Sequence, residues 1–524
     1  MASSANYNPD EMAQHDSSHI MKDGYIKQRW STLDTARASI LTRCEQYAAW
    51  TIPHAFPYAG INATSELQLD YQSFGSQAVS GMANRLGLTL ITPHRPFFRM
   101  ELSQDERAEM GDMQPAMIDY ALSQAELAAK KEHERLGLRA AVVDAAKLLL
   151  ITGNALLEAP EPDSDTLFQT LNMRRYVVKR DPTGKLLELI IQKVADLRTF
   201  SQDEQLAIMA ARTQDKDKSE VELYTYIVKG SDNKYHMYQA ADEWTLPNIH
   251  GIYTKDNLPF IPLVWNRIDG EDYGRGLVED YSGDFHAIAG LYEATTNYSA
   301  VLADIKFLSD PRANNDIDTL NNSATGTYVA AQPDTIRANT HGLQSHLQDI
   351  LQVLDRYERR VGLAFLMNSS MVRDAERVTA EEIRFMQNEL EAAHAAVFSS
   401  LTIDLQSVAK LLMQRLDLGD IKTDPTIVTG TDSLARSADV QAWQQLLNDL
   451  LALGQMPPEL LQMIKIEELI AIFGTGYGVD YQDIIKTQEE LQAEQEQQAQ
   501  AIAQQEAAQA AGQAAGEQAV QGQV

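Results

Sequence analysis

The stretch from Arg377 to Leu416 reads RVTAEEIRFMQNELEAAHAAVFSSLTIDLQSVAKLLMQRL and predicts one long helix with a marked start. Thr379 and Glu382 match a capping box, in which a hydroxyl and a carboxylate accept hydrogen bonds from backbone N–H groups of the first turn. Neither proline nor glycine interrupts the stretch, so the helix would be roughly 55 Å long. Its apolar residues recur at steps of three and four and would share one face; they are Ile383, Met386, Leu390, Ala393, Val397, Leu401, Leu405, Val408 and Leu412. A rod of this length suits a scaffold better than a compact catalytic domain.

Composition points to a large globular chain with an unusual charge balance. The 524 residues suffice for about two to four domains, and 44% of them are apolar, as is ordinary for folded proteins. The 74 acidic and 44 basic residues give a net charge of −30. Because free nucleic-acid-binding proteins normally present a basic surface, simple adhesion to DNA is disfavoured. A protein that touches DNA without holding it is not excluded.

Cysteine content and hydropathy set the expected compartment. The single cysteine, Cys44, excludes an internal disulfide and a cysteine-rich metal site, and its apolar, helical surroundings favour a buried, inert thiol over a nucleophile. No stretch approaches the ~18 uninterrupted apolar residues of a membrane span. The N-terminal sequence MASSANYNPDEMAQHD lacks the basic and apolar parts of a signal peptide. We therefore expect a soluble product assembled in a reducing cytoplasm.

The first half of the chain predicts a mixed α+β body over residues 1–270. Helical spacing extends over residues 21–50 and 73–89 and over most of 104–154, where Gly153 suits a helix C-cap. Residues 155–260 are rich in strand-forming runs, with Asp-Pro-Thr-Gly and Gly-Ser-Asp-Asn as hairpin turns. The expected sheet interior comprises Val177, Val178, Leu186, Leu189, Ile191, Tyr224, Tyr226 and Val228.

The second half predicts two rods joined by a small module. One helix runs from about Gly276 to Asp304, and a second runs from Leu343 to Met367 and leads through a short loop into the long helix. The segment between the two rods is polar and rich in asparagine. Two antiparallel helices with a distal insert would be exposed on all sides in a monomer, so they suggest packing against copies of the same chain. From Gln488 onward the sequence consists mostly of Gln, Ala, Gly and Glu, which predicts a frayed helix or a disordered tail.

A search for catalytic and metal-binding signatures returns little. The chain lacks a GxxxxGK[ST] phosphate loop, and the glycines of residues 474–478 lack a strand-turn-helix context. Glu132-His133-Glu134 lacks the second histidine of a zinc helix, and a solvated charged face explains it better. Adjacent acids such as Glu279 and Asp280 point in different directions on a helix and are best explained as surface residues.

Charge and position supply the candidate functional residues. If several copies enclosed a channel lined by acids, like charge would repel a DNA backbone from every wall; solubility explains the acids equally well. The loop between the second rod and the long helix contains Asn368, Met371, Val372 and Arg373, and it is either a channel-facing loop or a plain connector. Lys306, Arg312 and Arg337 in the distal insert could contact a partner or DNA, with surface solubility as the simpler explanation.

Several stretches together resemble one protein family. They are AERVTAEEIR (375–384), RIDGEDYGRG (267–276), GNALLEAPEP (153–162), VVKRDPTGKLLELI (177–190) and, nearer the N-terminus, QYAAWTIPHAFP. In these stretches and in their order, the chain is similar to the portal proteins, or head-to-tail connectors, of short-tailed, podovirus-type bacteriophages.

That resemblance implies an α+β, mainly helical portal fold, assembled as a ring of twelve subunits around a central channel for double-stranded DNA. The implied regions are a wing at 1–270, a first stem helix at 271–304, a clip at 305–342, a second stem helix at 343–367, a channel loop at 368–378, a long wing-to-crown helix at 379–418, a crown at 419–486 and a Gln/Ala-rich tail at 487–524. Arg373 would then meet phosphates in the channel, and Thr379 and Glu382 would set the root of the loop.

The resemblance also implies partners and a place in the virion. The implied partners are the large subunit of the terminase, which is the packaging ATPase, major capsid and scaffolding proteins, and tail adaptor or nozzle proteins, with internal core proteins as further candidates. The expected site is the unique vertex at the head-tail junction, with assembly in the host cytoplasm, no membrane insertion, no cofactor and no enzymatic activity. A metal-dependent hydrolase or nuclease on the α+β body is the alternative, and a monomeric internal scaffold is a third option.

Overall fold

The computed structural model combines helices and antiparallel sheets. It describes residues 17–60, 65, 70–93, 96–101, 115–161, 164–212, 219–303, 307–310, 312, 315–322, 335–338, 343–367, 380–415 and 426–429. The chain divides into two compact units. The first comprises Met1–Phe98, Ala128–Lys422 and Ile427–Gly430, and the second comprises Arg99–Leu127, Thr423–Thr426 and Thr431–Val524. Most described residues belong to the first unit.

Helices supply most of the described chain. None of them combines the length and apolar character needed to cross a membrane. They are α2 (Ser17–Ile20), α3 (Tyr25–Ala36), α4 (Ala38–Ala49), α5 (Phe74–Leu90), α7 (Pro115–Arg135), α8 (Leu138–Thr152), α9 (Gln202–Ala211), α10 (Leu277–Asp280), α11 (Ser282–Ala303), α12 (Ile317–Asn322), α13 (Leu343–Ala364) and α14 (Ala380–Arg415), with short 3-10 turns η1 (Met173–Arg175), η2 (Leu197–Thr199) and η3 (Lys255–Asn257).

A five-stranded antiparallel sheet forms the centre of the body, in the order β4-β5-β6-β7-β8. Its strands are β4 (Tyr176–Arg180), β5 (Leu186–Asp196), β6 (Glu220–Lys229), β7 (Tyr235–Ala241) and β8 (Trp244–Tyr253). Both predicted hairpin turns are present, since Gly184 N–H donates to Asp181 O at 2.9 Å and Gly230 N–H donates to Lys234 O at 2.8 Å. All eight residues expected in the sheet interior are buried.

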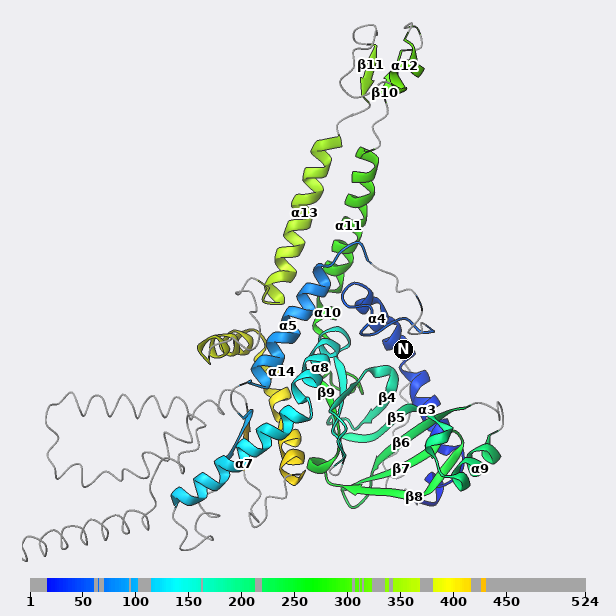
Figure 1. The fold of residues 1–524 in the computed structure, drawn as a ribbon, viewed down its shortest axis with the longest axis vertical. Helices are drawn as coiled ribbons and strands as arrows, with labels where there is room; N and C mark the ends of the chain where they lie inside the picture. The colour runs from blue at the N-terminus through cyan, green and yellow to red at the C-terminus, as the bar shows by residue number, and fades with distance from the viewer. Residues whose placement is uncertain are drawn as a thin grey trace, which may run out of the picture. The chain divides into compact units, whose positions relative to one another are not determined.

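Helix α3 covers one face of this sheet (Figure 1). Ile26 and Trp30 enter the same buried cluster as Val177 and Tyr226, and the Trp30 ring meets Tyr224 edge-on at 5.9 Å. The sequence predicts one helix over residues 21–50, but two are present, because Arg37 interrupts it with φ −99° and ψ 3°. The Arg37 guanidinium is buried and donates to the carbonyls of Met173 and Tyr176, so a tertiary contact outweighs the local helical preference.

A three-stranded sheet lies at the junction of the helices and the larger sheet. Its order is β3-β2-β9, with β2 (Asn154–Glu158) between β3 (Gln169–Leu171) and β9 (Phe260–Val264). The short strands β1 (Phe98–Glu101), β10 (Phe307–Ser309), β11 (Ile336–Ala338) and β12 (Thr426–Thr429) complete the described elements.

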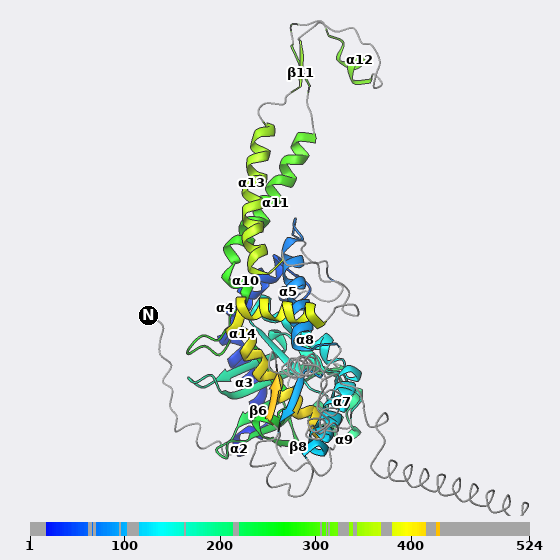
Figure 2. The ribbon, with the colours of Figure 1, turned by 90° about the vertical axis from the view of Figure 1, so that its left-hand side faces the viewer.

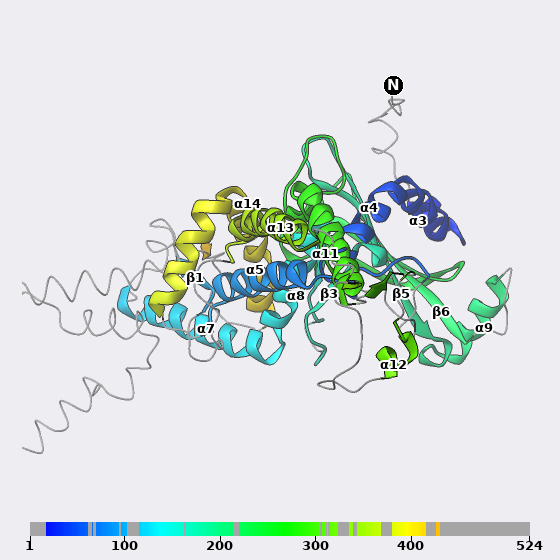
Figure 3. The same cartoon turned by 90° about the horizontal axis from the view of Figure 1, so that it is seen from above.

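Helices α5 and α8 lie side by side (Figure 3) and pack closely. A Cβ at Gly87 would lie 2.3 Å from Cγ2 of Val143, so only glycine allows this approach. The close packing predicted from the Gly- and Ala-rich sequence of residues 73–89 is confirmed.

The predicted uninterrupted rod is wrong in one respect. Helix α14 extends from Ala380 to Arg415 but breaks at His394, whose φ of −137° and ψ of 41° are not helical. Figure 2 shows the two parts of α14 running in different directions. No proline or glycine causes the break. The His394 ring instead packs on Trp265, with centroids 5.7 Å apart, and bonds to the backbone of Ala364. These contacts supply a physical reason for the bend.

Candidate functional site

The candidate site is the pair of helices α11 and α13 together with the segments that begin and end it. The two helices pack against each other (Figure 1). At the end of the pair where α13 finishes, the Phe365 ring meets Phe285 at 5.7 Å and Tyr281 at 6.3 Å, both edge-on. Ile288 and Val361 are also fully buried there. An aromatic and aliphatic cluster therefore joins the two helices where they meet the body.

Polar contacts continue the pairing along its length. Both nitrogens of the Arg360 fork donate to the Asp284 carboxylate, and the guanidinium lies 5.0 Å from the centroid of the Tyr357 ring. About two turns farther along α11, the Tyr292 hydroxyl donates to Glu358 at 2.5 Å. Since an arginine fork and a carboxylate match in geometry, these contacts fix the register of the two helices.

The root of α11 is a glycine junction where two of the family-like motifs meet. Gly153 ends α8 with φ +77°, as predicted for a C-cap, and a Cβ there would lie 2.4 Å from the carbonyl carbon of Arg275. A Cβ at Gly276 would lie 2.6 Å from Leu150 O. Asn154 closes the junction, since its Nδ2 donates to Gly274 O at 2.9 Å and its Oδ1 accepts from Gly274 N–H at 2.8 Å. The motifs at 153–162 and 267–276 therefore share one packed contact.

An ion-pair cluster surrounds that junction. Arg275 donates to Glu271 at 2.9 Å and to Glu279, and Glu279 also accepts from Arg43 at 3.2 Å. The sequence predicts Glu279 and Asp280 to be surface acids. Asp280 is exposed, but Glu279 is partly buried between two arginines. The start of the first rod is thus tied to α4 and to the loop that precedes α10.

Helix α13 ends in a left-handed turn. Leu366 has φ +54°, and Met367 N–H donates to Gly362 O at 2.7 Å. The candidate loop residues Asn368, Met371, Val372 and Arg373 and the cap residue Thr379 follow in sequence and lie outside the described residues. Glu382 falls in the first turn of α14, where the structure describes only the backbone. The capping box and the role of the loop remain predictions.

Two of the three basic candidates of the distal insert are described. Arg312 is exposed, and its backbone N–H donates to Asp310 at 2.9 Å. Arg337 lies in β11 opposite Leu308 of β10. Asn315 links the module, since its side-chain amide donates to Ser309 at 3.0 Å and to Thr335 at 2.9 Å. Lys306 and the predicted regions at 419–425 and 430–524 lie outside the described residues.

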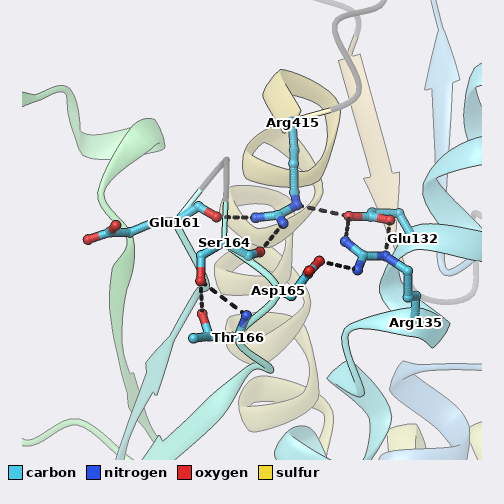
Figure 4. Close-up of polar contacts among 7 residues, drawn as sticks. All are labelled: Glu132, Arg135, Glu161, Ser164, Asp165, Thr166 and Arg415. Atoms are coloured by element: carbon cyan, nitrogen blue, oxygen red, sulfur yellow. Dashed lines mark hydrogen bonds and ion pairs between the residues drawn. The ribbon is translucent and has the colours of Figure 1, made fainter.

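The C-terminal part of α14, after the break at His394, packs on the body. Leu401, Leu405, Val408 and Leu412 are buried, as the predicted stripe requires. At the end of the helix, Arg415 donates to Glu132 of α7 at 2.8 Å and to the carbonyls of Glu161 and Ser164 (Figure 4). Glu132 also accepts a fork from Arg135, and these arginine hydrogen bonds lower its pKa to about 2. Arg415 therefore fixes the end of the long helix.

The interpretation of Glu132-His133-Glu134 as a solvated charged face is wrong for the first two residues. His133 is only 1% exposed, its ring meets Phe97 at 5.5 Å, and neither ring nitrogen has a hydrogen-bond partner among the described residues. Burial lowers the pKa of His133 to about 4. Arg135 and Arg415 satisfy the Glu132 carboxylate, whereas the His133 imidazole lies in the core against Phe97.

His133 should make the protein less stable in weak acid. Its folded pKa lies below the ordinary 6.5, so the unfolded chain binds the extra proton between these values. The stability is fully present above about pH 6.5 and falls as pH drops towards 4, by up to about 3 kcal/mol. His133→Leu should raise the thermal midpoint at pH 7 and reduce its drop between pH 7 and pH 5. Equal drops in the two proteins would contradict the assignment.

Other predictions and omissions concern single buried groups. Cys44 is buried, as predicted, and burial raises the pKa of its thiol to about 12, which disfavours the reactive thiolate. Sequence patterns did not find the Arg360–Asp284 fork or the Asn154–Gly274 pair, because each joins residues far apart in the chain. Asn154 and Gly274 nonetheless lie inside the family-like motifs at 153–162 and 267–276, and this resemblance is the sequence feature that could have marked them.

Known proteins are similar to this chain over most of its length. A family model described as bacteriophage head to tail connecting protein matches residues 23–485. The portal protein of Enterobacteria phage SP6 is 33% identical over 493 residues, covering 90% of this chain and 92% of the relative. The portal protein of Escherichia phage T7 is 29% identical over 495 residues, covering 91% of each chain.

Among solved structures, a chain from the neck of an empty GTA particle aligns over 74% of this chain and 91% of its own length, with 14% identity and a TM-score of 0.35.

The chain belongs to the bacteriophage head to tail connecting protein family. It is a structural connector of the portal type, at the junction between the head and the tail of the virion. The resemblance expected from the motifs is confirmed. The alternative of a metal-dependent hydrolase or nuclease finds no support in the family or in its relatives.

Proposed function

We propose that this chain assembles into a ring whose central channel carries double-stranded DNA into the capsid and later out of it. The expected number of subunits is twelve. The main support for this proposal is the exposed apolar surface on the α11–α13 pair, which flanks the distal insert. Helix α13 buries one side against α11 but leaves Leu351, Val353 and Leu363 exposed. Apolar residues exposed along a helix suit packing against another copy of the chain.

The expected regions would correspond to the following parts of the chain. The wing at 1–270 would contain both sheets, the stem would be α11 and α13, and the clip would contain β10, β11 and α12. Lys306, Arg312 and Arg337 would then face a clip partner or DNA. The channel loop with Asn368, Met371, Val372 and Arg373 would follow α13, and Thr379 and Glu382 would cap the start of α14. The crown at 419–486 would follow the long helix.

Charge supports passage of DNA rather than its capture. Twelve copies would carry 12 × −30 = −360 formal charges. Acids on the channel wall would repel phosphates and leave no deep energy minimum along the path. Counterions or basic partners would offset repulsion between subunits, so ring assembly should depend on salt concentration.

The proposed partners follow from this position. They are the large terminase subunit, capsid and scaffolding proteins and tail adaptor or nozzle proteins, with internal core proteins as further candidates. Assembly would take place in the host cytoplasm, and the ring itself would perform no chemistry.

Electron microscopy and native mass measurements of the purified chain test the ring directly. We expect closed rings of uniform subunit number with a central opening. A stable monomer at every salt concentration would overturn the proposal, and it would also favour the internal-scaffold option.

The channel loop has its own test. Arg373→Ala should leave ring assembly intact and reduce the yield of packaged phage, because a cation that meets phosphates in the channel is lost. Complementation of a portal-deficient phage measures the yield, and negative-stain images check the ring. An Arg198→Ala variant, at an exposed position that has no assigned role, serves as a control outside the loop. Unchanged yield with Arg373→Ala would remove the assigned role.

A further inference from the structure

A basic cavity opens at one end of the five-stranded sheet. Its volume is about 300 Å³, at the lower end of the range for ligand pockets. Six charged side chains line it, namely Arg180, Lys185, Lys229, Lys255, Arg267 and Asp404. Five of these six are cations, in a chain whose net charge is −30. The concentration of positive charge at this place therefore runs against the composition of the whole protein.

The topology of the sheet explains how these residues meet. In an antiparallel sheet, the β4–β5 and β6–β7 turns lie at the same end, and they bring Arg180, Lys185 and Lys229 together. The turn η3 supplies Lys255, and Arg267 follows shortly after strand β9. Helix α14 supplies Asp404. All of these elements belong to the first unit.

The two arginines are held in place by backbone oxygens. Gly184, at φ +83°, directs its carbonyl so that it accepts from Arg180 Nη1 at 3.0 Å and from Arg267 Nη1 at 3.5 Å. Arg180 also donates through Nε to Asp272 O at 3.2 Å. Within the described part of the chain, none of the five cations forms an ion pair with a carboxylate. The guanidinium groups are therefore positioned without being neutralised.

The charges in the cavity are not balanced by its single acid. Burial lowers the pKa of Arg180, and repulsion from the nearby Arg267 lowers it further. Burial raises the pKa of Asp404 to about 6, although Arg267, Arg180 and Lys255 oppose that rise. Oδ2 of Asp404 is buried and has no hydrogen-bond partner among the described residues. Among the residues that line the cavity, five cations therefore face one acid, while Asp181 and Asp272 act on Lys185 and Arg180 from outside the lining.

We propose that this cavity binds a terminal phosphate group, either as inorganic phosphate or as the phosphate end of a nucleotide. Arg180 would donate to the phosphate oxygens from the buried side, and Arg267, Lys185, Lys229 and Lys255 would neutralise the remaining charge from the more exposed side. Asp404, next to these cations, would limit the affinity as long as it is ionised.

A terminal phosphate fits the site better than the phosphodiester backbone of DNA. Arg180 is only 9% exposed, so a phosphate must enter the cavity to reach it. A backbone phosphate carries sugars on two sides and would stay at the surface with Lys255 and Arg267, which are exposed.

Isothermal titration calorimetry of the purified full chain at low ionic strength tests the site with three probes: sodium phosphate, ATP and an oligonucleotide without terminal phosphate. Saturable binding of phosphate or ATP is expected, and the tighter of the two identifies the source of the phosphate group. Sodium chloride at matched ionic strength measures the non-specific heat. Binding of the oligonucleotide alone would overturn the proposal in favour of surface contact with DNA.

Two matched double variants assign the binding to the cavity. Lys255→Gln with Arg267→Gln should weaken phosphate binding at least about tenfold, the loss expected when a charge-assisted hydrogen bond is removed. Lys22→Gln with Arg198→Gln removes the same charge from exposed positions that do not line the cavity, and it should leave the affinity unchanged. Equal affinities of the two double variants would overturn the assignment.

Asp404→Asn separates a phosphate site from a general effect of positive charge. Loss of the carboxylate should tighten phosphate binding roughly three- to tenfold at neutral pH, because a like charge is removed. The exposed Asp280→Asn makes the same change in net charge outside the cavity and should have no such effect. Weaker binding by Asp404→Asn, with an unchanged thermal midpoint, would contradict the arrangement.

Discussion

Gly153→Ala should lower the midpoint of thermal unfolding sharply and reduce the yield of folded protein. A non-glycine residue at φ +77° costs about 1–2 kcal/mol. The added Cβ would also lie 2.4 Å from the carbonyl carbon of Arg275 and 2.6 Å from the nitrogen of Gly276. Since both neighbours are backbone atoms, no rotamer change can relieve the overlap. The junction must open, and we expect a total cost above about 4 kcal/mol.

A matched control separates the two costs. Gly24 has φ +79°, and a Cβ there meets nothing within 4 Å, so Gly24→Ala should carry only the conformational cost. The comparison uses thermal midpoints from calorimetry, together with hydrogen exchange of peptides from α8 and α10. If both variants lost the same stability, the close contact between the two motifs would not constrain residue 153.

Phe365→Ala should loosen the paired helices at their base. Phe365 is 1% exposed and packs on Phe285 and Tyr281, so truncation removes its buried ring and leaves a cavity. The usual cost of such a change is about 3–5 kcal/mol. Because Phe365 lies at the end of α13, we expect faster hydrogen exchange along α11 and α13, with the large sheet unaffected.

Leu363, in the last turn of α13, provides the control for that experiment. It lies two positions away and is 65% exposed, so Leu363→Ala should change the stability of a single subunit by less than about 0.5 kcal/mol. The same substitution removes apolar surface that the proposed ring would cover. It should therefore weaken association while leaving hydrogen exchange within the dissociated subunit unchanged. Similar exchange in both variants would count against the packing role of Phe365.

Local patterns predicted the sheet and its turns well. Alternating apolar residues identified the interior from Val177 to Val228, and Asp-Pro-Thr-Gly and Gly-Ser-Asp-Asn marked the turns. The rods over α11 and α13 followed from helical spacing, although the first starts with a separate short helix and a break at Tyr281. These features depend on neighbours in the sequence, which is why the sequence alone revealed them.

Features made by distant residues could not be predicted in the same way. The bends at Arg37 and His394 arise from contacts with residues more than one hundred positions away in the sequence, such as Met173 and Trp265. The buried His133 ring packs on Phe97, which comes from a separate segment of the chain. Arg180 and Arg267 lie in two family-like motifs, yet no spacing rule connects them. Sequence similarity flagged these positions, and the three-dimensional contacts supply their physical reason.

The break at His394 changes how a push on the long helix would travel. A continuous helix behaves as a stiff lever, whereas a break in its hydrogen-bond ladder makes a compliant joint. A load on the part that begins at Ala380 would turn about His394 before it reached the anchored part that ends at Arg415. The joint itself is braced by Trp265 and by the end of α13. Strain applied to the part of α14 that begins at Ala380 would thus be damped at this joint, and the part that ends at Arg415 would keep its place on the body.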